Sequence, residues 1–118
     1  MYAVVRNDLV MAPGKLASQA GHAYVGAFTD AIQKTPDVIA AYHNEFPRSP
    51  GTKVCLQASL AQITRLIEEL AFTGIPHHVV YDSGCPAFCD GTRVLTALGL
   101  GPVTNNEAPK FLKRLKLL

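Results

Sequence analysis

A run of small side chains marks the first long helix that this sequence predicts. From Lys15 to about Gln33 the apolar residues recur with a helical period, at Leu16, Ala20, Ala23 or Tyr24, Ala27 and Ile32. Alanine and glycine are frequent there, and the glycines cost intrinsic helix stability. Close packing compensates for that cost when a smooth helix surface lies against a sheet or another helix. The chain must therefore fold around a helix held tightly to a neighbouring layer.

The rest of the sequence alternates between strand and helix patterns. Strands are expected at residues 2–6, 53–58, 76–81 and 93–98, and further helices at 36–44, 60–72 and 106–115. Thr35 is expected to cap the second helix, Ser59 and Gln62 to form a capping box for the third, and Gly74 to end it in a left-handed conformation. The order β-α-α-β-α-β-β-α predicts an α/β protein with a four-stranded mixed sheet flanked by helices.

Length and composition indicate one globular domain spanning residues 1–118. Hydrophobic residues make up 48% of the chain and charged residues 17%, which argues against disorder. The net charge of +2 neither requires nor excludes nucleic acid, although positive charge gathers near the end, at Lys110, Lys113, Arg114 and Lys116. Neither a signal peptide nor a membrane-spanning apolar segment is recognised, so we expect a cytoplasmic protein without a membrane partner.

Lys15 lies where the first helix begins, directly after Pro13 and Gly14. A helix N-terminus attracts anions, and a lysine there opposes the helix dipole unless an anion compensates. His22 projects from the same side two turns later, where it could transfer a proton or orient a base. A solvated lysine and a half-buried histidine bonded to a backbone carbonyl are the alternatives. The pattern favours a site for chemistry on an anion.

Two aspartates follow strands that are expected to end near this helix start. Asp8 comes after the first strand and Asp82 after the third, so both could face the same sheet edge. Their carboxylates could position water beside the anion site, whereas turn formation is the alternative role for a strand-end aspartate.

The three cysteines do not suggest a disulfide framework or a metal site. Three residues separate Cys85 from Cys89, one more than in the common zinc knuckle, and His77 and His78 would point to opposite faces of their strand. We therefore expect no metal. A nucleophilic or redox-active cysteine stays open, because a thiol needs an exposed, cationic setting to react.

Several motifs along the chain resemble the type II peptidyl-tRNA hydrolases. The opening Val4-Val-Arg-Asn-Asp-Leu9 and Met11-Ala-Pro-Gly-Lys-Leu-Ala-Ser-Gln-Ala-Gly-His-Ala23 carry the likeness first. Gly74-Ile-Pro76, Asp82-Ser-Gly84, Gly91-Thr-Arg93 and Leu115-Lys-Leu-Leu118 then match in order. The resemblance implies a four-stranded mixed sheet wrapped by helices, cleavage of the ester that joins a peptide to tRNA, and no metal or organic cofactor.

The resemblance also implies roles for individual residues. Lys15 would engage the tRNA backbone or the oxyanion, His22 would support the site, and Asp82 would orient or activate the attacking water. The remaining residues expected to contact substrate are Asp8, Gln19, Thr92 and Arg93. The expected partner is tRNA, and a homodimer is left open.

The loop after Asp82 departs from the family pattern. A basic residue, a threonine and a glutamine usually follow Asp-Ser-Gly, whereas this chain has Cys85, Pro86 and Ala87, and Val94 replaces a second threonine. The leading hypothesis is a hydrolase acting on peptidyl-tRNA or a related acyl ester. The alternative is a catalytically impaired RNA- or protein-binding module on the same fold. A third hypothesis makes Cys85 or Cys89 a new nucleophile or redox switch.

Overall fold

The computed structural model describes residues 1–45, 51–83 and 91–118. In these ranges the chain forms β1 (Tyr2–Arg6), α1 (Pro13–Lys34), α2 (Pro36–Glu45), β2 (Val54–Ala58), α3 (Leu60–Leu70), β3 (His77–Asp82), β4 (Val94–Leu100), the 3₁₀ turn η1 (Leu112–Arg114) and β5 (Lys116–Leu117). The strands make one sheet in the order β3-β4-β1-β2-β5. Only β1 and β2 are parallel neighbours among these pairs. The α/β class and the mixed sheet are confirmed.

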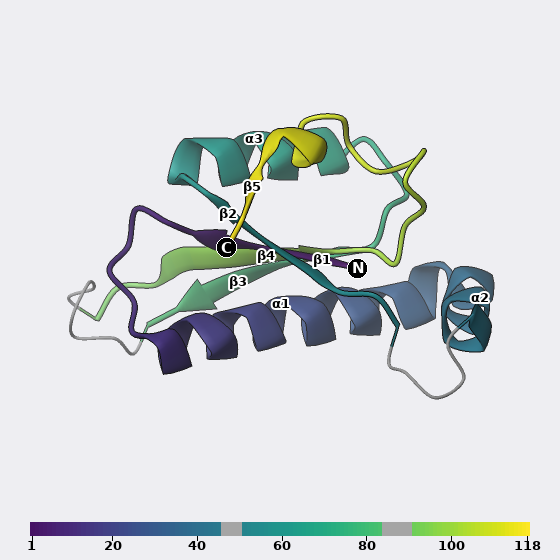
Figure 1. The fold of residues 1–118 in the computed structure, drawn as a ribbon, viewed down its shortest axis with the longest axis horizontal. Coiled ribbons are helices and arrows are strands. Elements are labelled where there is room, and N and C mark those ends of the chain that lie inside the picture. The colour runs from purple at the N-terminus through teal and green to yellow at the C-terminus, as the bar shows by residue number, and fades with distance from the viewer. Residues whose placement is uncertain (46–50, 84–90) are drawn as a thin grey trace.

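The sheet separates two layers of helix (Figure 1). The long α1 runs along one face, while α3 and the segment around η1 cover the other. Because β4 is antiparallel to both β1 and β3, the strands β1, β2 and β3 all end at the same side of the sheet. The first turn of α1 lies at this side as well (Figure 1). We call this side the carboxyl edge, since it is where polar strand-end residues gather.

The small residues of α1 allow the close packing that the sequence predicts. Its buried alanines are Ala20, Ala23, Ala27 and Ala31, a stripe with helical spacing. At Gly99 of β4 the helix comes so near that an added Cβ would overlap the carbonyl oxygen of Ala23. The sequence placed Ile32 on the buried face, but Ala31 lies there instead and Ile32 is exposed. The helix thus rests on the sheet through its smallest side chains.

Gly99→Ala is expected to destabilise the protein by about 1–3 kcal/mol, because the methyl group has no room and α1 must shift away from β4. Gly21→Ala is the matched control: nothing lies within 4 Å of a Cβ there. The control should raise stability by about 0.5–1 kcal/mol through helix propensity. Urea unfolding of both variants measures the difference, and equal stabilities would contradict the close-packing argument.

The prediction of four strands and a closing helix at 106–115 is wrong. Residues 106–111 form turns, and only Leu112–Arg114 is helical, as a 3₁₀ turn. Pro109 interrupts this segment and cannot donate a helical hydrogen bond. Beyond it, β5 pairs with the outer edge of β2, with Leu117 opposite Leu56. The edge of β2 offers backbone partners that a sequence pattern does not reveal.

Local signals at helix ends had mixed outcomes. The Ser59–Gln62 capping box at the start of α3 is confirmed. Thr35 lies directly before α2 as predicted, and its carbonyl accepts from the Ile39 amide, while its hydroxyl donates back to the Ala31 carbonyl of α1. Gly74 does not have a positive φ. Instead α3 ends at Leu70, whose carbonyl accepts from both the backbone N–H and the hydroxyl of Thr73.

Candidate active site

Two elements deliver the central side chains to the carboxyl edge. Asp82 is the last residue of β3. Lys15 lies in the first turn of α1, and Gln19 follows one turn later on the same helix face. The helix begins with Pro13 in its first turn, lacks a side-chain cap at Ala12 and has no acidic residue in that turn. Its positive dipole end is therefore available to an acidic group from another element.

Asp82 supplies that acidic group. The Lys15 ammonium forms an ion pair with Oδ2 of Asp82. Nε2 of Gln19 donates to the same oxygen at 3.0 Å. The side chains of Lys15 and Asp82 are 28% and 14% exposed, and Gln19 is buried. Two donors thus converge on one carboxylate oxygen in a place that keeps limited access to solvent.

Thr96 contacts Gln19 on the side away from Asp82, and the sequence did not mark it as a site residue. Its side chain is fully buried in β4, and its hydroxyl lies 2.5 Å from Oε1 of Gln19 and 3.3 Å from the Val80 carbonyl. The available signal was a single hydroxyl within an otherwise apolar strand, Val94–Leu100. A buried hydroxyl needs a hydrogen-bond partner, and for Thr96 that partner is Gln19, which binds Asp82.

Asp8 lies at the same edge but is engaged by another residue. Arg6 binds it through two hydrogen bonds, Nε to Oδ1 at 2.8 Å and Nη2 to Oδ2 at 2.9 Å. Nη1 of Arg6 donates to the Leu95 carbonyl at 3.1 Å, and the Leu60 amide at the start of α3 donates to Asp8. The hydrogen bonds from Arg6 hold the pKa of Asp8 below its usual value. The Arg6–Asp8 pair therefore joins β1, β4 and α3.

The other predicted site residues lie at the surface. His22 is exposed on α1, two turns after Lys15. Thr92 and Arg93 are exposed directly before β4. The guanidinium of Arg93 lies 5.4 Å from the centre of the Tyr81 ring, a cation–π arrangement. Val94 pairs with Asp82 across the two strands. The structure thus groups Lys15, Gln19 and Asp82 by direct contact and leaves His22 outside that contact.

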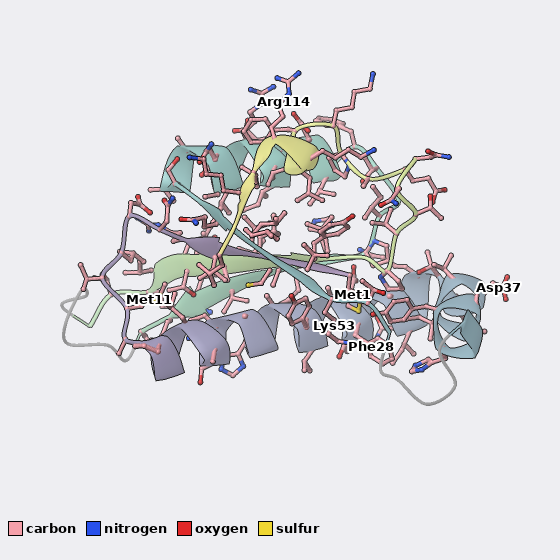
Figure 2. The ribbon with its side chains drawn as sticks, viewed as in Figure 1. Met1, Met11, Phe28, Asp37, Lys53 and Arg114 are labelled. Carbon is pink, nitrogen blue, oxygen red and sulfur yellow. The ribbon has the colours of Figure 1, made fainter. Side chains whose placement is uncertain are left out.

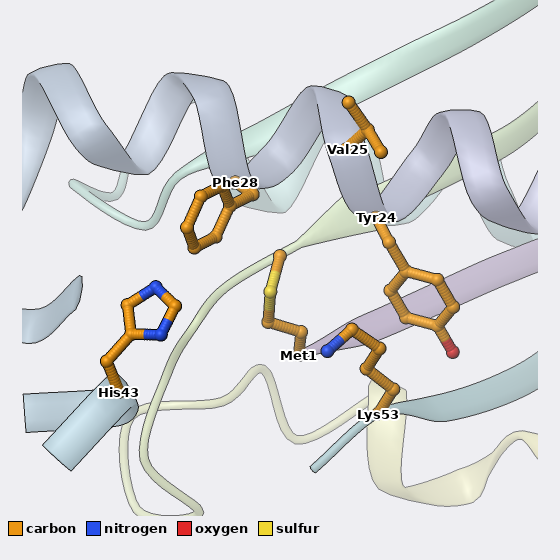
Figure 3. A pocket seen from close by; sticks show the side chains of 6 residues that line it. All are labelled: Met1, Tyr24, Val25, Phe28, His43 and Lys53. Atoms are coloured by element: carbon orange, nitrogen blue, oxygen red, sulfur yellow. The ribbon is translucent and has the colours of Figure 1, made fainter. Parts of the chain in front are cut away.

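A separate apolar pocket of about 220 Å³ lies away from this group. Met1, Tyr24, Val25, Phe28, His43 and Lys53 line it (Figure 3). Phe28, Met1 and Lys53 lie toward the α2 end of the molecule, whereas Met11 lies near the start of α1 (Figure 2). Burial, with a smaller contribution from Lys53, lowers the pKa of the Met1 amino group to about 6. The pocket and the carboxyl edge are distinct places.

Cys85, Pro86, Ala87 and Cys89 lie outside the described residues, and so do the hypotheses that rest on them. Burial raises the pKa of the Cys55 thiol, which makes it a poor nucleophile. Within residues 1–45, 51–83 and 91–118 no three metal-binding side chains group together. No helix in those ranges has both the length and the apolar character that crossing a bilayer requires.

A family model described as "Peptidyl-tRNA hydrolase PTH2" matches residues 1–118. The chain belongs to this family. A peptidyl-tRNA hydrolase of Methanococcus vannielii is 35% identical over 115 residues, covering 98% of this chain and 95% of the relative. That of Methanocaldococcus jannaschii is 34% identical over 118 residues, covering 100% and 98%. A probable peptidyl-tRNA hydrolase 2 of Schizosaccharomyces pombe is 31% identical, covering 96% of this chain and 54% of the relative.

Membership of the PTH2 family confirms the resemblance seen in the sequence. The likeness extends across the whole described structure, including the strand that ends at Asp82 and the helix that carries Lys15. Each of the three relatives is named as a hydrolase, so the comparisons favour an enzyme over the binding-module alternative.

Proposed function

We propose that this protein hydrolyses the ester bond between a peptide and tRNA. The observation that carries the proposal is the ion pair of Lys15 with Asp82 at the carboxyl edge, supported on one side by Gln19. An ester hydrolase needs a positioned water and a positive charge near the carbonyl oxygen, and this pair supplies a base and a cation together. Membership of the PTH2 family along the whole chain supports the choice of substrate.

In the proposed reaction a water molecule attacks the ester carbonyl carbon. The Asp82 carboxylate accepts a hydrogen bond from that water and receives its proton as the new carbon–oxygen bond forms. The Lys15 ammonium stabilises the negative charge on the tetrahedral intermediate, or holds a nearby phosphate of the tRNA. The bond to the tRNA oxygen then breaks, and that oxygen takes the proton. The products are a peptide with a free carboxyl group and tRNA.

The remaining residues would act farther from the ester. Thr92 and Arg93 are exposed next to Asp82, and Arg93 stacked on Tyr81 offers a cation to the RNA backbone. His22, exposed two turns along α1, is proposed as a further RNA contact rather than as a proton carrier. Asp8 would act indirectly, by holding Arg6 against the Leu95 carbonyl. A cytoplasmic location agrees with a tRNA substrate, and the homodimer stays a prediction.

The direct test is to incubate the purified protein with peptidyl-tRNA and measure release of free tRNA. Release is expected, and the apparent affinity should fall as salt rises, because phosphate contacts release counterions. Heat-unfolded protein is the control. Lack of release at any salt concentration would remove the proposal. Salt-sensitive binding without release would instead support the RNA-binding alternative.

A further inference from the structure

A β-bulge lies directly beside the candidate active site. Val80 pairs with Ala97, and the next residue of β3, Tyr81, pairs with Leu95. Thr96 is therefore the extra residue of β4, opposite no residue of β3. A bulge of this kind turns the following side chains to the other face of the sheet.

The core contacts reveal this exchange of faces. Ala97 packs with Val5 and Ala23 on the α1 side, whereas Leu98 packs in the cluster on the α3 side. Regular alternation would place Leu95 with Ala97 and Thr96 with Leu98. Instead Leu95 packs against the α3-side cluster, and Thr96 reaches Gln19 on α1. The bulge thus delivers a buried hydroxyl to the face that carries the site.

Asp82 and Thr96 together hold one orientation of the Gln19 amide. A glutamine amide has one accepting and one donating end, and rotation by 180° exchanges them. The ionised Asp82 carboxylate only accepts, so the Nε2 end of Gln19 faces it and donates to Oδ2. The Oε1 end then faces Thr96, whose hydroxyl donates to it. Gln19 is only 2% exposed, so bulk water does not provide a substitute donor. The opposite orientation would place an amide oxygen against the carboxylate.

We propose that Thr96 is a positioning residue for hydrolysis, acting through the Gln19 amide to hold the Asp82 carboxylate in place. The inference rests on the proposed function for its kinetic consequence, but the orientation of Gln19 can be tested without any substrate. Lys15 and Gln19 both bind Oδ2 of Asp82, so loss of the Gln19 donor removes a buried hydrogen bond that orients the carboxylate. A shift of about 1 Å in a catalytic group is enough to slow a reaction severely.

The kinetic test compares Thr96→Val, which keeps the shape of the side chain but lacks the hydroxyl, with Thr96→Ser. Thr96→Val should lower kcat on peptidyl-tRNA by about 10-fold with KM within about twofold, and Thr96→Ser should restore most of the loss. Thr29→Val is the control, since that exposed hydroxyl bonds the Val25 carbonyl of its own helix. Native kcat in Thr96→Val, or an equal loss in Thr96→Ser, would overturn the proposal.

A double-mutant cycle tests whether the effect passes through Gln19. If it does, Thr96→Val adds little to the loss caused by Gln19→Leu, whereas a further 10-fold loss, roughly, would mean an independent role. Nuclear magnetic resonance of the Gln19 side-chain amide gives the readout that needs no substrate. Its protons should exchange slowly in the native protein and in Thr96→Ser, and faster in Thr96→Val. Unchanged exchange in Thr96→Val would overturn the proposal even if peptidyl-tRNA is not the substrate. Should Thr96→Val fail to fold, Thr96→Ala carries the same comparisons.

Discussion

Asp82→Asn is expected to lower kcat on peptidyl-tRNA by about 10²–10⁴-fold, the range that a positioned general base contributes. Asparagine has nearly the same size as aspartate and can still accept from Gln19, so the fold should persist. It cannot take a proton from water, and the Lys15 ammonium loses its negative partner. The measurement is single-turnover release of tRNA at saturating enzyme.

Asp37→Asn is the matched control for this substitution. Asp37 is exposed in the first turn of α2, far along the chain from the carboxyl edge. This variant should hydrolyse the substrate at the native rate. If Asp82→Asn lost less than about threefold in kcat, the carboxylate would not be the base, and its role would be limited to holding Lys15.

Lys15→Ala is expected to lower kcat/KM by about 10²–10³-fold, comparable to the loss of one donor to an oxyanion. The parameter that changes separates two roles for the ammonium. A fall in kcat at constant KM means that Lys15 acts on charge that develops in the transition state. A rise in KM, with a salt dependence weaker by about one counterion, means that it holds a phosphate.

Lys34→Ala provides the control for Lys15. Lys34 lies in the last turn of α1 and forms an exposed ion pair with Asp30, so it shares the helix but not the site. Its loss should leave both kcat and KM close to native. Native activity in Lys15→Ala would show that the pair with Asp82 is structural, and urea unfolding would then reveal its contribution to stability.

The parts of the fold that depend on short-range patterns could be predicted from the sequence. The small residues and helical period of α1, and the Ser59–Gln62 capping box, are local signals, and both were confirmed. The strand β5 was not foreseen, because its pairing depends on a free edge of β2 many residues away. Pro109 would have been reason enough to doubt a helix over 106–115.

The candidate site could be predicted only in part, for a similar reason. Lys15 and Asp82 are marked by their places at a helix start and a strand end, and they do meet. Gln19 was expected to contact substrate, yet it is buried between Asp82 and Thr96. Thr96 was missed because simple alternation assigns it to the other face, and only the bulge in β4 reverses that.

The position of Val94 shows why comparing single positions can mislead. The threonine that usually follows Gly-Thr-Arg is absent at Val94, which suggested that the site had lost a hydroxyl. The structure nevertheless brings the Thr96 hydroxyl into contact with Gln19. A site can therefore retain a polar group that a position-by-position reading counts as lost.

The contact between Gly99 and Ala23 fixes the direction of α1 and therefore the position of Lys15 in its first turn. Lys15 precedes Ala23 by eight residues, which is about 12 Å along a helix axis. Pivoting α1 about that contact by about 5° would displace Lys15 by about 1 Å, an error that can slow a reaction about 100-fold. A methyl group added at Gly99 could thus impair hydrolysis from a distance, with every residue of the site intact.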